Sequence, residues 1–485
     1  MHAHHEASSE RPGDAMNTDL WKLNATELGA AVARGEVPAV QVVESHLARI
    51  AAVNPAVNAV TQLMADGARE AARTTDRRRA AGEQLGPLAG VPFTVKENIH
   101  VAGWATTHGV RAFRDQVAEA DSPPVRRLRA AGAIPIGHSN MPDLALSSEP
   151  ESQLFGVTYN PWDRTRSPGG SSTGDGVAVA VGMAALGLGN DAGGSVRLPA
   201  AFNGVAGLKP SHGRFAADHR IMGQEPMLAS QLIPVDGPIA RSVADLRAAY
   251  EALAGADPAD PRAVPVPAYG PRSTGPLRVG VVADPAGAGV HPEIRAALDQ
   301  AAAVLEQAGY VVEEVRIPRF AESLECYGKL IMTEFGVNWP RVRQLLTEKG
   351  AQHIDLFMDR TPHTDLAEFL RQTGVRLGIQ RAWAQLLDTH PLLLGPTSTQ
   401  PVPGTDVLPD GTDTESHARL MLPGALCTVT SLVGVPAVSV PIGFADGMPQ
   451  SVQLIGQMYR EDRCLRAAEE LERHFGVLAP LDPRP

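Results

Sequence analysis

The sequence predicts an α/β fold, and three regions of the chain support this prediction. Residues 88–99 form a short apolar run entered through Gly-Val-Pro, and residues 123–137 have the pattern of a helix, a turn and a strand. Further on, strand-like runs at 277–282 and 310–317 flank a helical pattern over 293–308. Such alternation of strands and helices is typical of α/β architecture.

The composition is that of a soluble globular protein, with 44% hydrophobic and 20% charged residues in a chain of 485. The net charge of -11 gives no electrostatic support for a nucleic-acid partner. Cys326, Cys427 and Cys464 lie far apart without a CxxC motif, which argues against a disulfide framework and favours a cytoplasmic location. The longest apolar run, residues 177–188, is too short to span a membrane.

The two ends of the chain differ in character. Residues 1–17 lack the apolar segment of a signal peptide and are expected to form a disordered tail. Helical periodicity follows over about 20–63, where Asn24 and Glu27 resemble a capping box. After a long helical region, about 319–390, the chain ends in strand-like runs and an amphipathic helix at 462–475. No shift in composition marks a boundary, so residues 18–480 are expected to form a single domain.

Two clusters of glycine and serine lie between residues 159 and 209. The first is Gly169–Gly174 (GGSSTG) and the second is Asp191–Ser195 (DAGGS). An uncharged stretch rich in alanine, valine and glycine separates them. Small residues at this density let backbones approach closely, so we expect a tightly packed interior hairpin with the serines at its ends.

Ser195 follows two glycines, and successive backbone N–H groups in such a turn can point at one developing oxyanion. Taken alone, the motif is better explained as a turn before a helix at 196–202. Two other interpretations use nearby glycines. Gly170–Gly174 fits a GxSxG nucleophile elbow with Ser172 as nucleophile, but a polar loop rather than a strand precedes it. Residues 187–192 fit a dinucleotide GxGxxA pattern but lack the acidic residue expected about 20 positions later.

Lys96 lies inside the apolar segment FTVKENI. Burial would lower the pKa of the lysine and make it a usable base, whereas an ion pair with Glu97 or another carboxylate would keep it charged. The residues alone leave both alternatives open. The chain has no Ser-x-x-Lys motif, which excludes a site of the penicillin-binding type.

Taken in order, three segments resemble the amidase-signature family: GVPFTVKENI, SPGGSSTGDG and GNDAGGSVRLP. The flanking segments YNPWD, GPTST, GVPAVSVPIGF and QSVQLIGQ agree, so the resemblance extends from about Leu20 to Phe475. It implies the amidase-signature fold, a large mixed central β-sheet covered by helices on both faces.

The resemblance also implies a role for each motif residue. Ser195 would attack the substrate carbonyl and form an acyl-enzyme, and Ser171, held across a cis peptide in the family, would pass the proton to Lys96. The expected oxyanion-hole donors are the backbone N–H groups of Ala192, Gly193, Gly194 and Ser195. The expected supporting residues are Ser172, Asp191 and Arg197.

The substrate pocket is less specified. Thr173, Asp175 and Ala192 differ from the usual family residues, which bears on loop geometry and pocket width. As pocket walls we expect the helical region 319–390 and, on sequence grounds alone, Trp104, Thr106, Met141 and Cys326.

The resulting hypothesis is an amidase that hydrolyses a small-molecule carboxylic amide to an acid and ammonia or an amine, without a metal or cofactor. The first alternative is the same chemistry on a carbamate, an anilide or a cyclic amide. A less favoured one is the A subunit of an amidotransferase, and a non-catalytic scaffold is disfavoured because Lys96, Ser171 and Ser195 are all present. A homodimer is left open.

Overall fold

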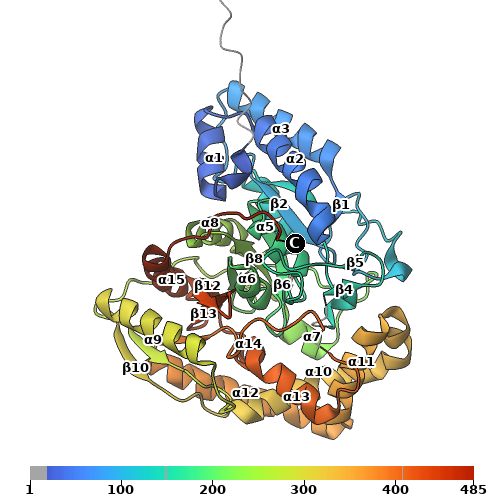
Figure 1. The fold of residues 1–485 in the computed structure, drawn as a ribbon, viewed down its shortest axis with the longest axis vertical. Helices are drawn as coiled ribbons and strands as arrows, with labels where there is room; N and C mark the ends of the chain where they lie inside the picture. The colour runs from blue at the N-terminus through green and yellow to red at the C-terminus, as the bar shows by residue number, and fades with distance from the viewer. Residues whose placement is uncertain (1–18, 148–149, 407, 485) are drawn as a thin grey trace, which may run out of the picture.

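The computed structural model describes residues 19–147, 150–406 and 408–484, so the predicted tail at 1–17 lies outside the described residues. The chain is built around an 11-stranded sheet (Figure 1). Across the sheet, the strands are β1 (Val60–Leu63), β3 (Ile134–Ser139), β2 (Pro92–Lys96), β6 (Leu186–Asp191), β8 (Val235–Ala240), β7 (Ala206–Lys209), β12 (Ala437–Ala445), β13 (Met448–Gly456), β11 (Leu392–Pro396), β9 (Arg278–Val281) and β10 (Val311–Glu314). The short strands β4 (Glu151–Ser152) and β5 (Gly156–Val157) form a separate pair.

The sheet is mixed, as the family resemblance implies. Strands β3, β2 and β6 run parallel, as do β11, β9 and β10, whereas the strands between these two groups pair antiparallel. The inner strands β2, β6 and β8 are buried along their whole length. Burial of every residue, rather than of alternate residues, is expected for strands covered on both faces.

Helices cover the sheet on both sides. They are α1 (Ala25–Arg34), α2 (Ala39–Val57), α3 (Ala65–Ala80), α4 (Pro123–Ala130), α5 (Thr173–Ala180), α6 (Arg197–Asn203), α7 (Leu228–Leu232), α8 (Val243–Leu253), α9 (Pro292–Gln307), α10 (Phe320–Val342), α11 (Glu348–Arg360), α12 (Leu366–Thr389), α13 (Thr414–Met421), α14 (Ala425–Val433) and α15 (Glu461–Phe475). On strand β7, Gly207 faces Ala200 of α6, whereas Leu208 lies in the apolar core with residues of α8 and α15. Since neighbouring strand residues point to opposite faces, α6 and the α8–α15 pair cover opposite sides.

The predicted helical region at 319–390 is observed as α10, α11 and α12, which lie at the lower end of the view in Figure 1. Together with α14 they enclose a second apolar cluster, in which Trp383 is fully buried. This cluster reaches the sheet through Leu393 and Ile455. The helical region is therefore packed against the sheet rather than held on a linker.

The N-terminal prediction is confirmed in part. The capping box is present, because the Asn24 N–H donates to the Glu27 carboxylate at 2.8 Å and α1 begins at the next residue. The helical pattern expected up to Leu63 is wrong at its end, where residues 60–63 form β1 instead. Asn58 ends α2 in the left-handed conformation (φ 52°), and the chain then pairs with β3.

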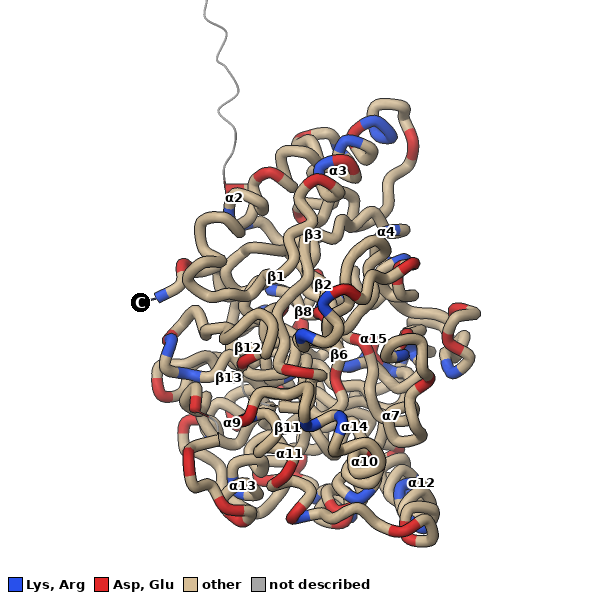
Figure 2. Tube along the Cα trace, turned by 90° about the vertical axis from the view of Figure 1, so that its right-hand side faces the viewer, with Lys and Arg blue, Asp and Glu red and all other residues tan. Residues whose placement is uncertain are grey.

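The described ranges contain no helix long and apolar enough to cross a bilayer. In Figure 2, acidic and basic residues are interspersed on outer helices such as α3 and α12. Charges of both signs therefore share the same surfaces.

Candidate active site

Strand β2 ends at Lys96, whose side chain is fully buried. Lys96 Nζ lies 2.8 Å from Ser171 Oγ and 2.7 Å from Asn190 Oδ1. The next residue, Glu97, accepts hydrogen bonds from the side chains of Thr107 and Gln62 instead. The Lys96 amine thus contacts two neutral groups, Ser171 and Asn190. The sequence did not identify Asn190 as a partner of the lysine.

Burial lowers the pKa of Lys96 to about 7, because the charged form loses its hydration inside the protein. Asp175, Asp191 and Asp236 favour the charged form but do not outweigh burial. The pKa of Asp175 is itself raised by burial. A substantial fraction of Lys96 is consequently neutral near pH 7 and able to accept a proton.

The first glycine-serine cluster forms the turn that enters α5. The peptide bond between Gly170 and Ser171 is cis. Ser172 Oγ donates to the Asn190 carbonyl at 3.2 Å, in space that a Cβ on Gly189 would fill. The Ser172 N–H donates to the Ser195 carbonyl at 3.0 Å and so joins the two clusters. Because Ser172 is fully buried, it does not suit the nucleophile role of the GxSxG interpretation.

The second cluster forms the turn between β6 and α6, and Ser195 is only partly buried in it. The Gly194 N–H donates to Asp191 Oδ1 at 2.7 Å and is therefore engaged. The other expected oxyanion donors, the N–H groups of Ala192, Gly193 and Ser195, have no acceptor within the described residues. Three of the four expected donors are thus not engaged by another group of the described chain. Between the hydroxyls of Ser195 and Ser171 the described chain shows no hydrogen bond.

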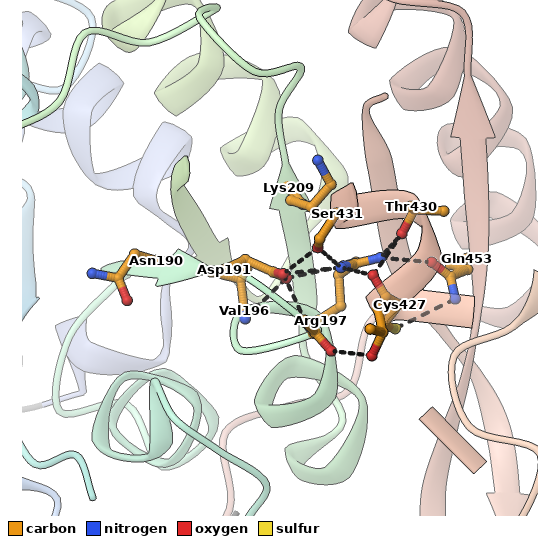
Figure 3. A network of polar contacts seen from close by, with 12 residues as sticks. Asn190, Asp191, Val196, Arg197, Lys209, Cys427, Thr430, Ser431 and Gln453 are labelled. Carbon is orange, nitrogen blue, oxygen red and sulfur yellow. Dashed lines mark hydrogen bonds and ion pairs between the residues drawn. The ribbon is translucent and has the colours of Figure 1, made fainter. Parts of the chain in front are cut away.

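Asp191 and Arg197 form a bidentate ion pair that holds this turn (Figure 3). Asp191 Oδ2 meets Arg197 Nε at 2.9 Å, and Asp191 Oδ1 meets Nη2 at 2.9 Å. Both side chains are fully buried. Burial alone would raise the pKa of Asp191, but the Arg197 charge and hydrogen bonds outweigh it and hold the pKa well below its usual range. The carboxylate is therefore ionised.

Arg197 also ties the turn to distant parts of the chain. Its guanidinium donates to the Cys427 carbonyl at 2.8 Å and to Ser431 Oγ at 3.0 Å, both on α14. It reaches Thr430 Oγ1 on the same helix and Gln453 Oε1 on β13. Arg197 therefore links the turn to α14 and β13.

Cys326, which was expected as a pocket wall, lies inside an apolar core cluster in the structure. Cys326 is fully buried in the second apolar cluster, and its thiol lies 3.5 Å from the Gln372 carbonyl of α12. The next residue, Tyr327, points about 100° further round α10. Its hydroxyl lies 3.2 Å from the position that a Cβ on Gly193 would occupy. Because neighbouring residues lie on different faces of a helix, the helical periodicity of α10 was the sequence signal that could have identified Tyr327, rather than Cys326, as a neighbour of the turn.

The other expected wall residues offer little surface. Thr106 and Met141 are 4% and 1% exposed, which leaves them almost no area for a substrate. Trp104 is half-buried and packs against the main apolar core. The described residues contain no group of three or more His, Cys, Asp or Glu side chains placed to hold a metal ion.

Known proteins resemble the chain over almost its whole length. Indoleacetamide hydrolase of Bradyrhizobium diazoefficiens is 38% identical over 95% of this chain and 88% of its own. The A subunit of glutamyl-tRNA(Gln) amidotransferase from Symbiobacterium thermophilum is 37% identical over 92% of this chain and 95% of its own. Among solved structures, 6-aminohexanoate cyclic dimer hydrolase complexed with substrate superposes with a TM-score of 0.83 at 29% identity, covering 96% of this chain and all of that one.

The model of the Amidase family matches residues 41–465, a span that holds the lysine strand, both glycine-serine clusters and all eleven strands of the sheet. These findings agree with the sequence resemblance and support amide hydrolysis as the activity. The chain belongs to the amidase family, whose members act on amide bonds.

Proposed function

We propose that this enzyme hydrolyses an amide with an apolar, aromatic acyl part, through an acyl-enzyme on Ser195. The observation that carries the proposal is the 2.8 Å contact between Ser171 Oγ and the buried amine of Lys96. The lowered pKa of Lys96 supports its role as a base at neutral pH. The Ser172–Ser195 backbone bond supports the proximity of the nucleophile to this pair.

In the proposed reaction, Ser195 Oγ turns toward Ser171 and attacks the carbonyl carbon. Its proton passes to Ser171 Oγ as the Ser171 proton passes to Lys96 Nζ. The carbonyl electron pair moves to oxygen, where the N–H groups of Ala192, Gly193 and Ser195 stabilise the oxyanion; one such donor contributes about 3–4 kcal/mol. Lys96 returns the proton through Ser171 to the leaving nitrogen as the C–N bond breaks. Water then repeats the sequence and releases the acid.

The surroundings of the oxyanion turn support an apolar acyl group. Ala192 and Tyr327 both pack against the second apolar cluster. The Tyr327 hydroxyl and Thr428 Oγ1 lie nearest to Gly193. An aromatic ring with one polar edge is a common recognition element for apolar ligands. The identity of a relative as an indoleacetamide hydrolase supports the same class of substrate.

We infer further that residues 18–480 form one catalytic domain, since β1 and β13, from opposite ends of the chain, belong to the same sheet. Cys326, Cys427 and Cys464 are free, buried thiols, which supports a cytoplasmic location. A homodimer stays a prediction.

The amidotransferase relative supports a second candidate, an A subunit that releases ammonia for a partner. The Leu198 of the RLP segment, where RQP is expected for that class, weighs against it. The two candidates differ in whether the chain is active alone.

The test is to assay the purified full chain, without partners, on indoleacetamide, phenylacetamide, an anilide, a carbamate, a cyclic amide and glutamine. We expect the arylacetamides to have the highest kcat/KM. Added hydroxylamine should divert the acyl group to a hydroxamate that mass spectrometry detects. The second candidate would be favoured if glutamine were the only substrate hydrolysed and if its hydrolysis required added amidotransferase partner subunits. Turnover of arylacetamides without any hydroxamate would contradict the acyl-enzyme.

A further inference from the structure

Lys96 has a second partner, and it is an amide. Asn190 Oδ1 lies 2.7 Å from Lys96 Nζ, a shorter distance than that to Ser171. Asn190 is the residue before Asp191 at the end of β6 and is only 9% exposed. In Figure 3 the two neighbours point in opposite directions, Asp191 into the Arg197 network and Asn190 away from it.

Asn98 is bonded to the same amide. Asn190 Nδ2 donates to Asn98 Oδ1 at 2.9 Å. Asn98 follows Lys96 by two residues, and both asparagines lie just beyond Val95 and Leu188, the last residues that pair β2 with β6. An asparagine amide that gives its NH₂ group to Asn98 presents its oxygen to Lys96. Since an ammonium group carries donors only, this is the orientation that suits the protonated lysine.

We propose that Asn190 positions Lys96 for proton exchange with Ser171, and that Asn98 acts through Asn190 by fixing the orientation of its amide. The proposal rests on the proposed function, in which Lys96 is the base. A neutral amine has two N–H groups and one lone pair. When Asn190 takes one N–H, the lone pair is free to face the Ser171 hydroxyl. When Lys96 gains the proton, the same oxygen accepts a stronger, charge-assisted bond.

Among the polar groups around Lys96, Asn190 is neutral whereas three carboxyl groups can carry charge. Asp175 on α5, Asp191 on β6 and Asp236 on β8 all favour the ammonium form of Lys96, against its burial. The hydroxyl of Thr94, two residues before Lys96 on β2, donates to Asp175 Oδ1 at 2.7 Å. This contact places the Asp175 carboxylate beside β2. A charge introduced at position 190 should therefore shift the equilibrium between neutral and protonated Lys96, in a direction set by the sign of that charge.

The experiment measures kcat and KM from pH 5 to 10, with the best amide from the panel, for variants of the full chain. Asn190→Asp places a carboxylate next to Lys96 and should move the acid limb of kcat/KM upward by about 1–3 pH units. Asn190→Leu removes the acceptor and should move the limb downward, with kcat lowered about 100-fold through lost positioning and KM little changed. Opposite shifts are not expected from general damage to the fold.

Asn98→Leu should lower kcat less than Asn190→Leu. The double variant should be no worse than Asn190→Leu, because Asn98 acts only through that amide. Asn54→Leu is the matched control. Asn54 bonds the backbone of Ala59 and Val60 at the end of α2, so its loss should lower Tm but leave the pH limb in place.

The outcomes separate this inference from the proposed function. If Lys96→Met keeps wild-type activity, Lys96 is not the base and the proposed function fails. If Lys96→Met is inactive while Asn190→Asp and Asn190→Leu keep the wild-type limb, or shift it in the same direction, the positioning role alone is overturned. If Asn190→Leu does not fold, the direction of the shift in Asn190→Asp and the kcat of Asn98→Leu decide the question.

Discussion

Asp191 and Arg197 join the two ends of the turn that carries Ser195, and the pair is fully buried. Asp191 also accepts from the Gly194 and Val196 N–H groups, at 2.7 and 3.2 Å. A buried ion pair gains little from charge attraction alone, because both groups lose their hydration. Here the surrounding hydrogen bonds satisfy the remaining polar atoms, so the pair fixes the shape of the turn on both sides of Ser195.

Breaking this pair should cost far more stability than breaking a surface pair. Arg197→Met leaves Asp191 charged and buried, and we expect the free energy of unfolding to fall by about 3–5 kcal/mol. Arg69→Met is the control, since Arg69 and Glu44 form an ion pair that is 34% and 42% exposed, and its loss should cost about 0–1 kcal/mol. Urea unfolding measures both. Equal, small losses would show that the buried pair does not hold the turn.

The pH dependence of activity should follow the protonation of Lys96. The pKa of Lys96 is lowered by burial to about 7, and in the proposed mechanism Lys96 accepts a proton only when neutral. Below pH 7, kcat/KM should therefore fall about tenfold per pH unit, and it should reach a plateau in the alkaline range. A profile that is flat, or that peaks in acid, would contradict the assignment of the base.

Lys209 offers a matched control for this profile. It is a second fully buried lysine, also with a pKa lowered by burial to about 7, and its Nζ donates to the Pro210 carbonyl at 2.9 Å. Lys209→Met should leave the midpoint of the limb unchanged, whereas Lys96→Met should remove the activity itself. A displaced midpoint in Lys209→Met would mean that the limb reports another group.

The two serines should differ in what their removal leaves behind. Ser195→Ala removes the proposed nucleophile and should lower kcat roughly a million-fold, with no acyl-enzyme detected by intact mass. Ser171→Ala should lower kcat by about 10²–10⁴-fold, because water can bridge to Lys96 in place of the hydroxyl. Ser172→Ala removes the bond to the Asn190 carbonyl but neither hydroxyl of the proposed relay, so it should lower kcat less than Ser171→Ala. Full activity in Ser195→Ala would reject the proposed nucleophile.

Much of this site is predictable from sequence because its residues lie in motifs whose order along the chain is specific. Ser171 and Lys96 were expected to share a proton relay, and Asp191 and Arg197 were expected beside the second cluster; the structure brings the members of each pair into contact. The alternation of strands and helices likewise predicted most elements of the sheet.

The parts of the fold and of the site that the sequence did not predict depend on contacts between segments far apart in sequence. Asn190 lies 94 positions from Lys96, and only the pairing of β2 with β6 shows that their side chains meet. Residues 60–63 form a strand because β3 lies beside them, which a local helical pattern does not reveal. The helix that carries Cys326 and Tyr327 was expected, but the sequence did not reveal that Tyr327, and not Cys326, lies beside Gly193.

That face of α10 gives the last prediction, which compares these two neighbours. Tyr327→Ala removes the hydroxyl and ring beside Gly193, so we expect KM for arylacetamides to rise about tenfold or more, with a smaller effect on acetamide. Cys326→Ala leaves a small cavity in the second apolar cluster and should lower stability by about 1 kcal/mol while KM stays unchanged. Steady-state kinetics and thermal unfolding of both variants test the pair. Because the side chains are adjacent but point in different directions, a rise in KM for Cys326→Ala and none for Tyr327→Ala would place the acyl pocket on the other side of α10.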